Sequence, residues 1–290
     1  MLRTIANDKL IVTINETGAE LWSIRADTEY LWQGDPAVWA GRSPTIFPYV
    51  ARLFEGRYTV DGQPYRLPIH GFAGSMAFTP VQVQNDSITM ELQSSKLTLA
   101  LYPWPFVFRV RYALEGNQLN ITYSVKNTGK TPMAFGLGGH PGFNVPLDNG
   151  LAFDDYVLRF DEPCAPEQVL FTPDCFVTGE KPAYPLRGGD TLPLKHELFD
   201  NDAIVLYGAA KGVTLLSPKG QRGVHVTCPQ MPYLGFWHMP HTDAPYVCIE
   251  PWSSLPAKYG EITEFTDNPN LIHLDAGKTY ENVWSIEILF

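Results

Sequence analysis

Two neighbouring stretches alternate apolar and polar residues with a period of two, and they constrain the fold more than any other part of the sequence. Every second side chain in residues 106–114 is apolar, and residues 119–125 repeat this pattern after a turn at 115–117. Because side chains alternate between the two faces of a strand, the pattern predicts a hairpin with one buried and one wet face. The buried face would contain Phe106, Phe108, Val110, Tyr112, Leu114, Leu119, Ile121, Tyr123 and Val125.

The rest of the chain is typical of short strands joined by turns. No helix-period segment of ten residues stands out, and only residues 195–199 could form a single helical turn. Residues 39–54 contain two prolines and no regular period, which predicts an ordered loop. Residues 58–60 and 64–67 are expected to form a short hairpin about Asp61-Gly62. Further strands are expected at 10–14, 19–25, 81–84, 87–92, 156–160, 203–207, 213–216, 223–227, 233–237, 246–249 and 283–289.

This strand-rich pattern predicts an all-β sandwich with long loops. Aromatic residues make up 13% of the chain and charged residues only 18%, which suits strands and turns better than long surface helices. No Pro/Ser-rich linker, repeat or low-complexity run divides the sequence. We therefore expect one domain over residues 1–290.

Charge and targeting signals exclude several classes of partner. The net charge of −10 argues against nucleic acid, whose phosphate backbone requires a basic surface. The N-terminus lacks the apolar segment of a signal peptide, and no apolar run is long enough to span a membrane. The four cysteines are scattered without a CxxC pair, so free and mostly buried thiols are expected. These features predict a soluble, cytoplasmic protein.

The stretch from Gly136 to Pro146 surrounds a single imidazole, His140, with glycines and prolines. Glycine allows backbone turns that other residues cannot make, and proline fixes φ, so we interpret the stretch as a tight loop. The loop follows a strand pattern, which places His140 near a strand end that faces a cleft. A turn that merely contains a histidine is the ordinary alternative.

Four more residues are candidates for chemistry. Glu250 lies among apolar residues, where desolvation would raise the pKa of its carboxyl towards the range of a general base, but its side chain could equally point outward. His70 lies in a Gly/Pro-rich loop like that of His140. The two histidines and Glu250 could form an acid/base set if the fold brings them together. Arg52 could bind substrate hydroxyls or pair with a carboxylate. Asp202 could accept hydrogen bonds from a polyol, although a turn aspartate is the simpler interpretation.

Other kinds of site fit the sequence less well. The only closely spaced metal-ligand pair, His238 and His241, lacks a carboxylate at a usual offset, so no metal site is predicted. The motifs HExxH, GxSxG and GxGxxG before a helix are absent. A glycosidase needs two carboxylates, and Glu250 has no obvious partner except Asp202. The aromatic residues that could line a sugar pocket, although core is the simpler interpretation of each, are Trp237, Trp252, Phe72 and Phe143.

Four short motifs resemble the signatures of the aldose 1-epimerase (mutarotase) family and occur in the same order. The motifs extend over about residues 45–256 and are Arg52 in Ala-Arg-Leu, His70 in His-Gly-Phe-Ala, His140 in His-Pro-Gly-Phe-Asn-Val and Glu250 in Ile-Glu-Pro. The resemblance implies the fold of galactose mutarotase, a large β-supersandwich of mostly antiparallel strands with a cleft on one face.

The resemblance also implies a reaction, the interconversion of α and β anomers of a free sugar without a cofactor or metal. In the family a glutamate takes the proton of the anomeric hydroxyl while a histidine protonates the ring oxygen; the ring opens, the C1–C2 bond rotates, and the ring closes on the other face. By motif match, Glu250 is the base and His140 the acid. His70 and Arg52 would bind hydroxyls and stabilise developing charge. Asp202 matches the binding aspartate of the family by its position before a strand.

Three positions depart from familiar galactose mutarotases, so a preference for galactose is not implied. Gly142 stands where those proteins have an aromatic residue, Ala203 where they have histidine, and Trp252 where they have glutamine. Another branch of the family resembles hexose-6-phosphate mutarotases, which need a basic phosphate clamp. The candidates for such a clamp, which form no recognisable cluster in the sequence, are Arg42, Arg57 and Arg66.

We therefore expect a mutarotase of the shorter bacterial-type branch that acts on a free hexose or related sugar. A small-molecule sugar is the one expected partner, and the oligomeric state is left open. A carbohydrate-binding or sensing protein that lost turnover, and a glycoside-processing enzyme, are the alternatives. The presence of both Glu250 and His140 favours the enzyme, because binding alone needs no acid/base pair.

Overall fold

The computed structural model describes all residues from Met1 to Phe290, and strands dominate it. It contains strands β1 to β24, a single short α-helix and four turns of 3-10 helix. The strand pairs are antiparallel except for that of β22 (Thr263–Glu264) with β5 (Arg57–Val60), which is parallel. The all-β class and the mostly antiparallel pairing are confirmed.

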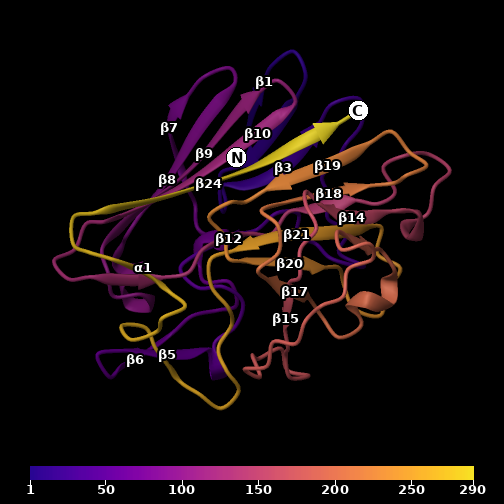
Figure 1. Cartoon of the computed structure of the whole chain (residues 1–290). Helices are drawn as coiled ribbons and strands as arrows, with labels where there is room; N and C mark the ends of the chain where they lie inside the picture. The colour runs from indigo at the N-terminus through magenta and orange to yellow at the C-terminus, as the bar shows by residue number, and fades with distance from the viewer.

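A nine-stranded sheet forms one large layer of the molecule, drawn across the upper part of Figure 1. Many of its neighbouring strands are far apart in the chain, and both termini lie in the upper half of the picture. In sheet order the strands are β16 (Thr191–Pro193), β14 (Val157–Phe160), β18 (Gly212–Leu216), β19 (Gly223–Thr227), β24 (Thr279–Leu289), β10 (Gln118–Asn127), β9 (Phe106–Glu115), β8 (Ser87–Gln93) and β7 (Thr79–Val83).

The predicted hairpin of β9 and β10 is present and lies beside β24, the middle strand of this layer. Phe108 pairs with Val125, Val110 with Tyr123, and so on along the hairpin. Their side chains are buried, whereas the residues between them are partly or fully exposed. The period-two pattern therefore predicted both the strands and the face that packs inward.

A second sheet lies below the first in Figure 1 and carries the candidate site. All seven residues of its strand β21 (Tyr246–Trp252) are buried, as expected for a strand covered on both faces. One face of this sheet packs on the nine-stranded sheet, and the other lines a cavity. The order is β15 (Glu167–Val169), β17 (Ile204–Tyr207), β20 (Tyr233–Trp237), β21, β12 (Gly138–Gly139) and β4 (Thr45–Ile46), and β13 (Gly142–Asn144) also pairs with β21.

Three small sheets complete the fold. The predicted hairpin at Asp61-Gly62 is present, with both turn residues in the left-handed region that such a tight turn requires. The strand β1 and the six-residue helix α1 lie in segments whose sequence carries no clear period, and neither was predicted. The elements are β1 (Leu2–Ala6), β2 (Ile11–Asn15) and β3 (Glu20–Arg25); β5, β6 (Gln63–Arg66) and β22; β11 (Met133–Phe135) with β23 (Ile272–Leu274); and α1 (Lys96–Leu101).

The glycine-rich stretch is a correction to the sequence analysis, because its glycines do not form a tight turn. None of the glycines from Gly136 to Gly142 has a positive φ, and two short strands, β12 and β13, run through the stretch beside β21. Their lack of a side chain is what matters. A Cβ on Gly139 would lie 2.7 Å from the Trp284 ring of β24, and one on Gly138 would lie 2.7 Å from the carbonyl oxygen of Pro251. Glycine is needed here for close approach of neighbouring strands.

Sixty-six buried residues form one hydrophobic cluster that includes residues from β2 through β24. Trp284 belongs to this cluster and joins the nine-stranded sheet to the back of the site sheet. None of the helices has the length and apolar character needed to cross a membrane. The expectation of a single domain stays a prediction.

Candidate active site

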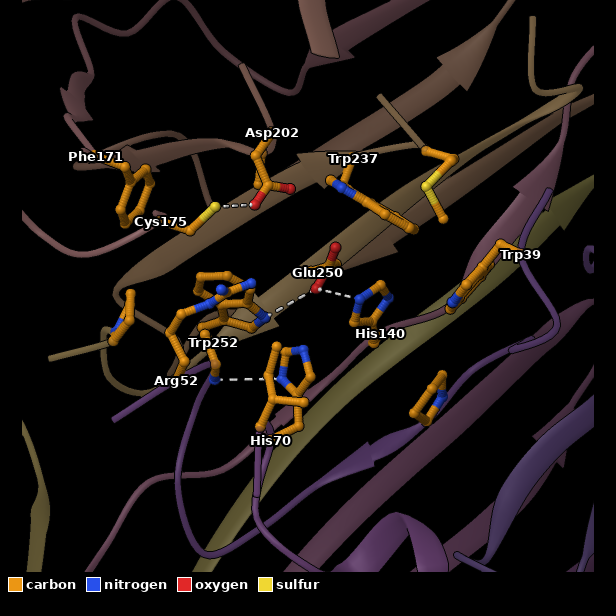
Figure 2. Close-up of a pocket in the computed structure, with 16 residues that line it drawn as sticks. Trp39, Arg52, His70, His140, Phe171, Cys175, Asp202, Trp237, Glu250 and Trp252 are labelled. Carbon is orange, nitrogen blue, oxygen red and sulfur yellow. Dashed lines mark hydrogen bonds and ion pairs between the residues drawn. The ribbon is translucent and has the colours of Figure 1, made fainter. Parts of the chain in front are cut away.

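A cavity of about 360 Å³ is lined by all five residues that the sequence analysis singled out, Arg52, His70, His140, Asp202 and Glu250. Figure 2 shows Glu250 and His140 in the middle of the cavity, with Trp39 and Phe171 at opposite ends. The volume is within the range of small-molecule sites, about 300–1,000 Å³. Residues from four distant parts of the chain thus meet in one hollow.

Strand register places His140 opposite Glu250. Gly138 pairs with Trp252, and Gly142 pairs with Cys248. His140, midway between the two glycines, therefore lies opposite Glu250, midway between Cys248 and Trp252. The two side chains lie on the cavity face, where His140 Nε2 is 3.3 Å from Glu250 Oε2. On the other side of β21, Glu250 pairs with Gly235, which has no side chain to fill the space beside the carboxyl.

Burial controls the protonation of this pair. Glu250 is 1% exposed, and burial, aided by the negative charge of Asp202, raises the pKa of its carboxyl well above the ordinary value. His140 is 8% exposed, and burial, aided by His70, holds the pKa of its imidazole well below the ordinary value. Both shifts disfavour charge. Burial therefore favours a neutral carboxyl beside a neutral imidazole, with one proton between the two facing atoms.

Aromatic rings fix the His140 imidazole. The ring of Trp39 stacks on it with centroids 5.1 Å apart, and Trp237 meets it edge-on at 5.6 Å. A Cβ on Gly142 would lie 3.0 Å from the Trp39 ring, so the missing aromatic residue at position 142 leaves room for this tryptophan. Nδ1 of His140 is buried and has no hydrogen-bond partner in the protein.

The tautomer of His70 follows from its backbone contacts. The amide of Ala51 donates a hydrogen bond to His70 Nδ1 at 3.2 Å, and the amide of His70 donates to the carbonyl of Ala51 at 2.8 Å. Because Nδ1 accepts, the proton of the neutral ring is on Nε2. Burial, aided by the positive charge of Arg52, lowers the pKa of His70 to about 4. His70 is thus a neutral hydrogen-bond donor at the cavity wall.

The side chain of Arg52 has no hydrogen-bond partner within the protein, whereas that of Asp202 has one. The guanidinium of Arg52 makes no salt bridge and no side-chain hydrogen bond within the protein, which leaves its donors free for a ligand. Asp202 receives a hydrogen bond from the thiol of Cys175, with Sγ 2.7 Å from Oδ2. Burial and this carboxylate raise the pKa of Cys175 to about 11, so the thiol keeps its proton. Oδ1 of Asp202 stays available to the cavity.

Strained backbone is concentrated at the cavity. Eight residues other than glycine have a positive φ, and four of these line the cavity. Such conformations cost about 1–3 kcal/mol each and persist where surrounding contacts hold them, often at functional sites. The four are Ala51 (φ 53°), His70 (62°), Cys175 (62°) and Asp202 (73°).

The pair and the neighbouring Cys248 thiol together offer three potential metal ligands. Ligand atoms of His140, Cys248 and Glu250 lie within 4.8 Å of one another, and all three residues are buried. Burial raises the pKa values of both the Cys248 thiol and the Glu250 carboxyl, so a cation would have to displace two strongly held protons. The donor set therefore suits proton transfer better than metal binding at neutral pH.

Of the four aromatic residues considered as possible walls of a sugar pocket, two line the cavity and two do not. Trp237 and Trp252 line the cavity, and the Trp252 indole donates to Glu250 Oε2 at 3.2 Å. Phe72 and Phe143, by contrast, are fully buried in the core. Sequence reasoning missed Trp39, Phe171, Cys175 and Met239, and only Trp39, a large aromatic residue in a turn-rich segment, carried a signal.

No basic phosphate clamp surrounds the cavity. The three candidate arginines are outside its lining, where Arg42 lies over the Trp22 ring, Arg57 pairs with Glu55, and Arg66 donates to the carbonyl of Glu55. Ala203 and Trp252, two of the departures from familiar galactose mutarotases, do line the cavity. The cavity walls therefore differ in side-chain chemistry from those expected for a familiar galactose mutarotase.

Comparison with known proteins places these features in a family. A sequence profile described as aldose 1-epimerase matches residues 1–287. The chain is 31% identical to the chromosomal LacX protein of Lactococcus lactis, with 98% of both chains covered. It is similar to the structure of a galactose mutarotase related enzyme from Lactobacillus acidophilus (TM-score 0.94, 32% identity, 99% and 97% of the chains covered). It is also similar to that of a galactose mutarotase-like protein from Lactobacillus casei (TM-score 0.93, 30% identity, 99% and 100% covered).

Proposed function

The chain belongs to the aldose 1-epimerase family, and on this premise we propose that it is a mutarotase that interconverts the α and β anomers of a free sugar. The family and the galactose mutarotase-like fold were both predicted from the sequence and are confirmed. The observation that carries the activity is the contact of 3.3 Å between His140 Nε2 and Glu250 Oε2 in a sugar-sized cavity. Opening a hemiacetal needs a base and an acid acting on one C–O unit, and these two groups lie together.

The reaction begins with a shift of the shared proton. In the empty cavity burial favours a protonated Glu250 beside a neutral His140. Sugar hydroxyls entering the cavity would replace part of the missing solvation and favour the alternative, a carboxylate beside an imidazolium. The carboxylate of Glu250 then takes the proton of the anomeric hydroxyl while His140 protonates the ring oxygen. Ring closure after rotation about C1–C2 returns both protons, so the pair is reset.

The remaining polar residues would orient the sugar and stabilise charge. The Nε2–H of His70 and the guanidinium of Arg52 can donate hydrogen bonds to hydroxyls and to the developing oxyanion. Oδ1 of Asp202 can accept from a hydroxyl, since the Cys175 thiol occupies Oδ2. We propose these roles for the three residues, and none of them requires a cofactor.

Anomer exchange followed by polarimetry or NMR on glucose and galactose tests the proposal. We expect the intact protein to accelerate exchange, and Glu250→Gln to lower the rate by about 100-fold or more, because it removes the base but keeps the side-chain shape. Glu115→Gln, an exposed substitution at the end of β9, is the control and should leave the rate unchanged. Binding of either sugar without any acceleration would favour the non-catalytic sugar-binding alternative.

The glycoside-processing alternative has one observation in its favour. Asp202 lines the same cavity as Glu250, and its charge raises the pKa of that carboxyl, so a second acid lies near the first. His140, however, faces Glu250 directly, which suits hemiacetal opening. Release of nitrophenol from aryl glycosides, measured in the same samples, would distinguish the two reactions.

We also propose a cytoplasmic location. All four cysteines are free, with Cys228 and Cys248 buried and the other two partly exposed. Free, partly exposed thiols are typical of a reducing compartment.

A further inference from the structure

A second hollow of about 520 Å³ continues from the candidate active site. The two cavities share three residues, Phe171, Cys175 and Asp202, which therefore form the boundary between them. Figure 2 shows these three residues on the side of the cavity away from Trp39. The residues that line only the second hollow are Thr172, Pro173, Asp200, Asn201 and Pro240.

The lining of the second hollow suits an uncharged polyol. It contains an amide, a hydroxyl and two carboxylates, but no lysine, arginine or histidine. Asp200 Oδ1 is already engaged, since it accepts the backbone amide of His241 at 3.2 Å and lies 3.2 Å from Nδ1 of the His241 imidazole. The ring of Phe171, partly exposed and shared by both cavities, offers an apolar surface of the kind on which sugar rings pack. The charged side chains in this lining are both aspartates, which would repel an anionic group.

The position of the hollow also defines which end of a substrate could reach it. The acid/base pair lies in the middle of the first cavity beside Trp39, so the anomeric carbon of a bound sugar must lie there. The hollow adjoins the first cavity at Phe171, Cys175 and Asp202, which lie on the side away from Trp39. A sugar unit in the hollow would therefore be attached through a hydroxyl other than the anomeric one, which leaves the anomeric hydroxyl free to react.

We propose that the second hollow is a subsite for an additional sugar unit, so that the preferred substrate is an uncharged reducing disaccharide or longer saccharide. The proposal rests on the mutarotase function and goes beyond it by naming the substrate class. It requires no chemistry beyond that of the acid/base pair, because the second unit only binds. The free guanidinium of Arg52 alone does not favour a phosphorylated sugar, since two carboxylates line the same cavity.

Rates of anomer exchange for maltose, cellobiose, lactose, glucose and glucose 6-phosphate test this subsite. We expect kcat/KM to be higher for at least one disaccharide than for glucose, and lowest for the phosphate. Asn201→Trp should fill the hollow, because Asn201 is exposed there and lines only the second cavity. It should reduce kcat/KM for the preferred disaccharide about tenfold, or about 1.4 kcal/mol, and leave the value for glucose nearly unchanged.

Asn149→Trp is the matched control, since Asn149 is exposed in a loop outside both cavities. Equal loss for disaccharide and glucose in Asn201→Trp, a preference for glucose over every disaccharide, or a preference for glucose 6-phosphate would each overturn the subsite while leaving the mutarotase function intact. Absence of exchange with every sugar would instead reject the function, and the subsite with it.

Discussion

At the scale of single residues, the proton shared by Glu250 and His140 decides what the cavity can do. Desolvation raises the pKa of the acid and lowers that of the imidazole, so the two shifts have the same effect of keeping the pair neutral. The pair with one proton is the reactive form. It gains a second proton only below the ordinary pKa of histidine, and it loses its only proton above the raised pKa of Glu250. A bell-shaped pH profile follows.

Asp202→Asn should move the alkaline limb of that profile to lower pH. The negative charge of Asp202 is one cause of the raised pKa of Glu250, so its removal makes the Glu250 carboxyl lose its proton at lower pH. The measurement is kcat/KM for anomer exchange between about pH 5 and pH 10, with attention to the position of the limb rather than the height of the profile. Asp86→Asn, in an exposed turn, is the control. A limb that stays in place or moves to higher pH would contradict this account.

At the scale of elements, the glycine-rich stretch determines how closely the two large sheets approach. The period-two pattern of β9 and β10 could be read locally, because their own side chains define a buried and an exposed face. The pairing of β12 and β13 with β21 could not, because it depends on residues more than a hundred positions away in the chain. The close approach explains why these positions are glycine although none has a left-handed backbone.

Gly139→Ala should destabilise the protein by about 1–3 kcal/mol, a typical cost of overpacking a core. The added methyl group would lie 2.7 Å from the Trp284 ring, which is buried in the core. Gly74→Ala is the control, since its methyl group would meet its nearest neighbour at an ordinary 3.5 Å. Urea unfolding of the two variants and the parent chain provides the comparison. Equal stability of the two variants would mean that close approach does not select glycine at position 139.

At the scale of the whole molecule, one cluster of buried residues connects the chain from its first strands to its last. Val12 of β2 and Ile288 of β24 belong to the same cluster of sixty-six residues. Elements that share so large a core should unfold together. This is the physical basis for the expectation of a single domain.

Calorimetry should detect one cooperative unfolding transition, with equal calorimetric and van't Hoff enthalpies. Trp284→Ala should lower the free energy of unfolding by about 3–5 kcal/mol and shift that transition as a unit, because Trp284 joins the two large sheets. Two separate transitions in the parent chain, or a variant in which only one part of the transition moves, would contradict a single domain.

The sequence by itself determined the strands whose side chains alternate, the hairpin at Asp61-Gly62 and, through four short motifs, the family. These features are local, since each depends on residues that are close together in the chain. Only the tertiary structure decided that His140 faces Glu250, that Trp39 stacks on His140, that Cys175 binds Asp202, and that Arg52 stays unpaired. Each of these is a contact, or the absence of one, between residues far apart in the chain, and only the packing of strands and loops in three dimensions brings such residues together.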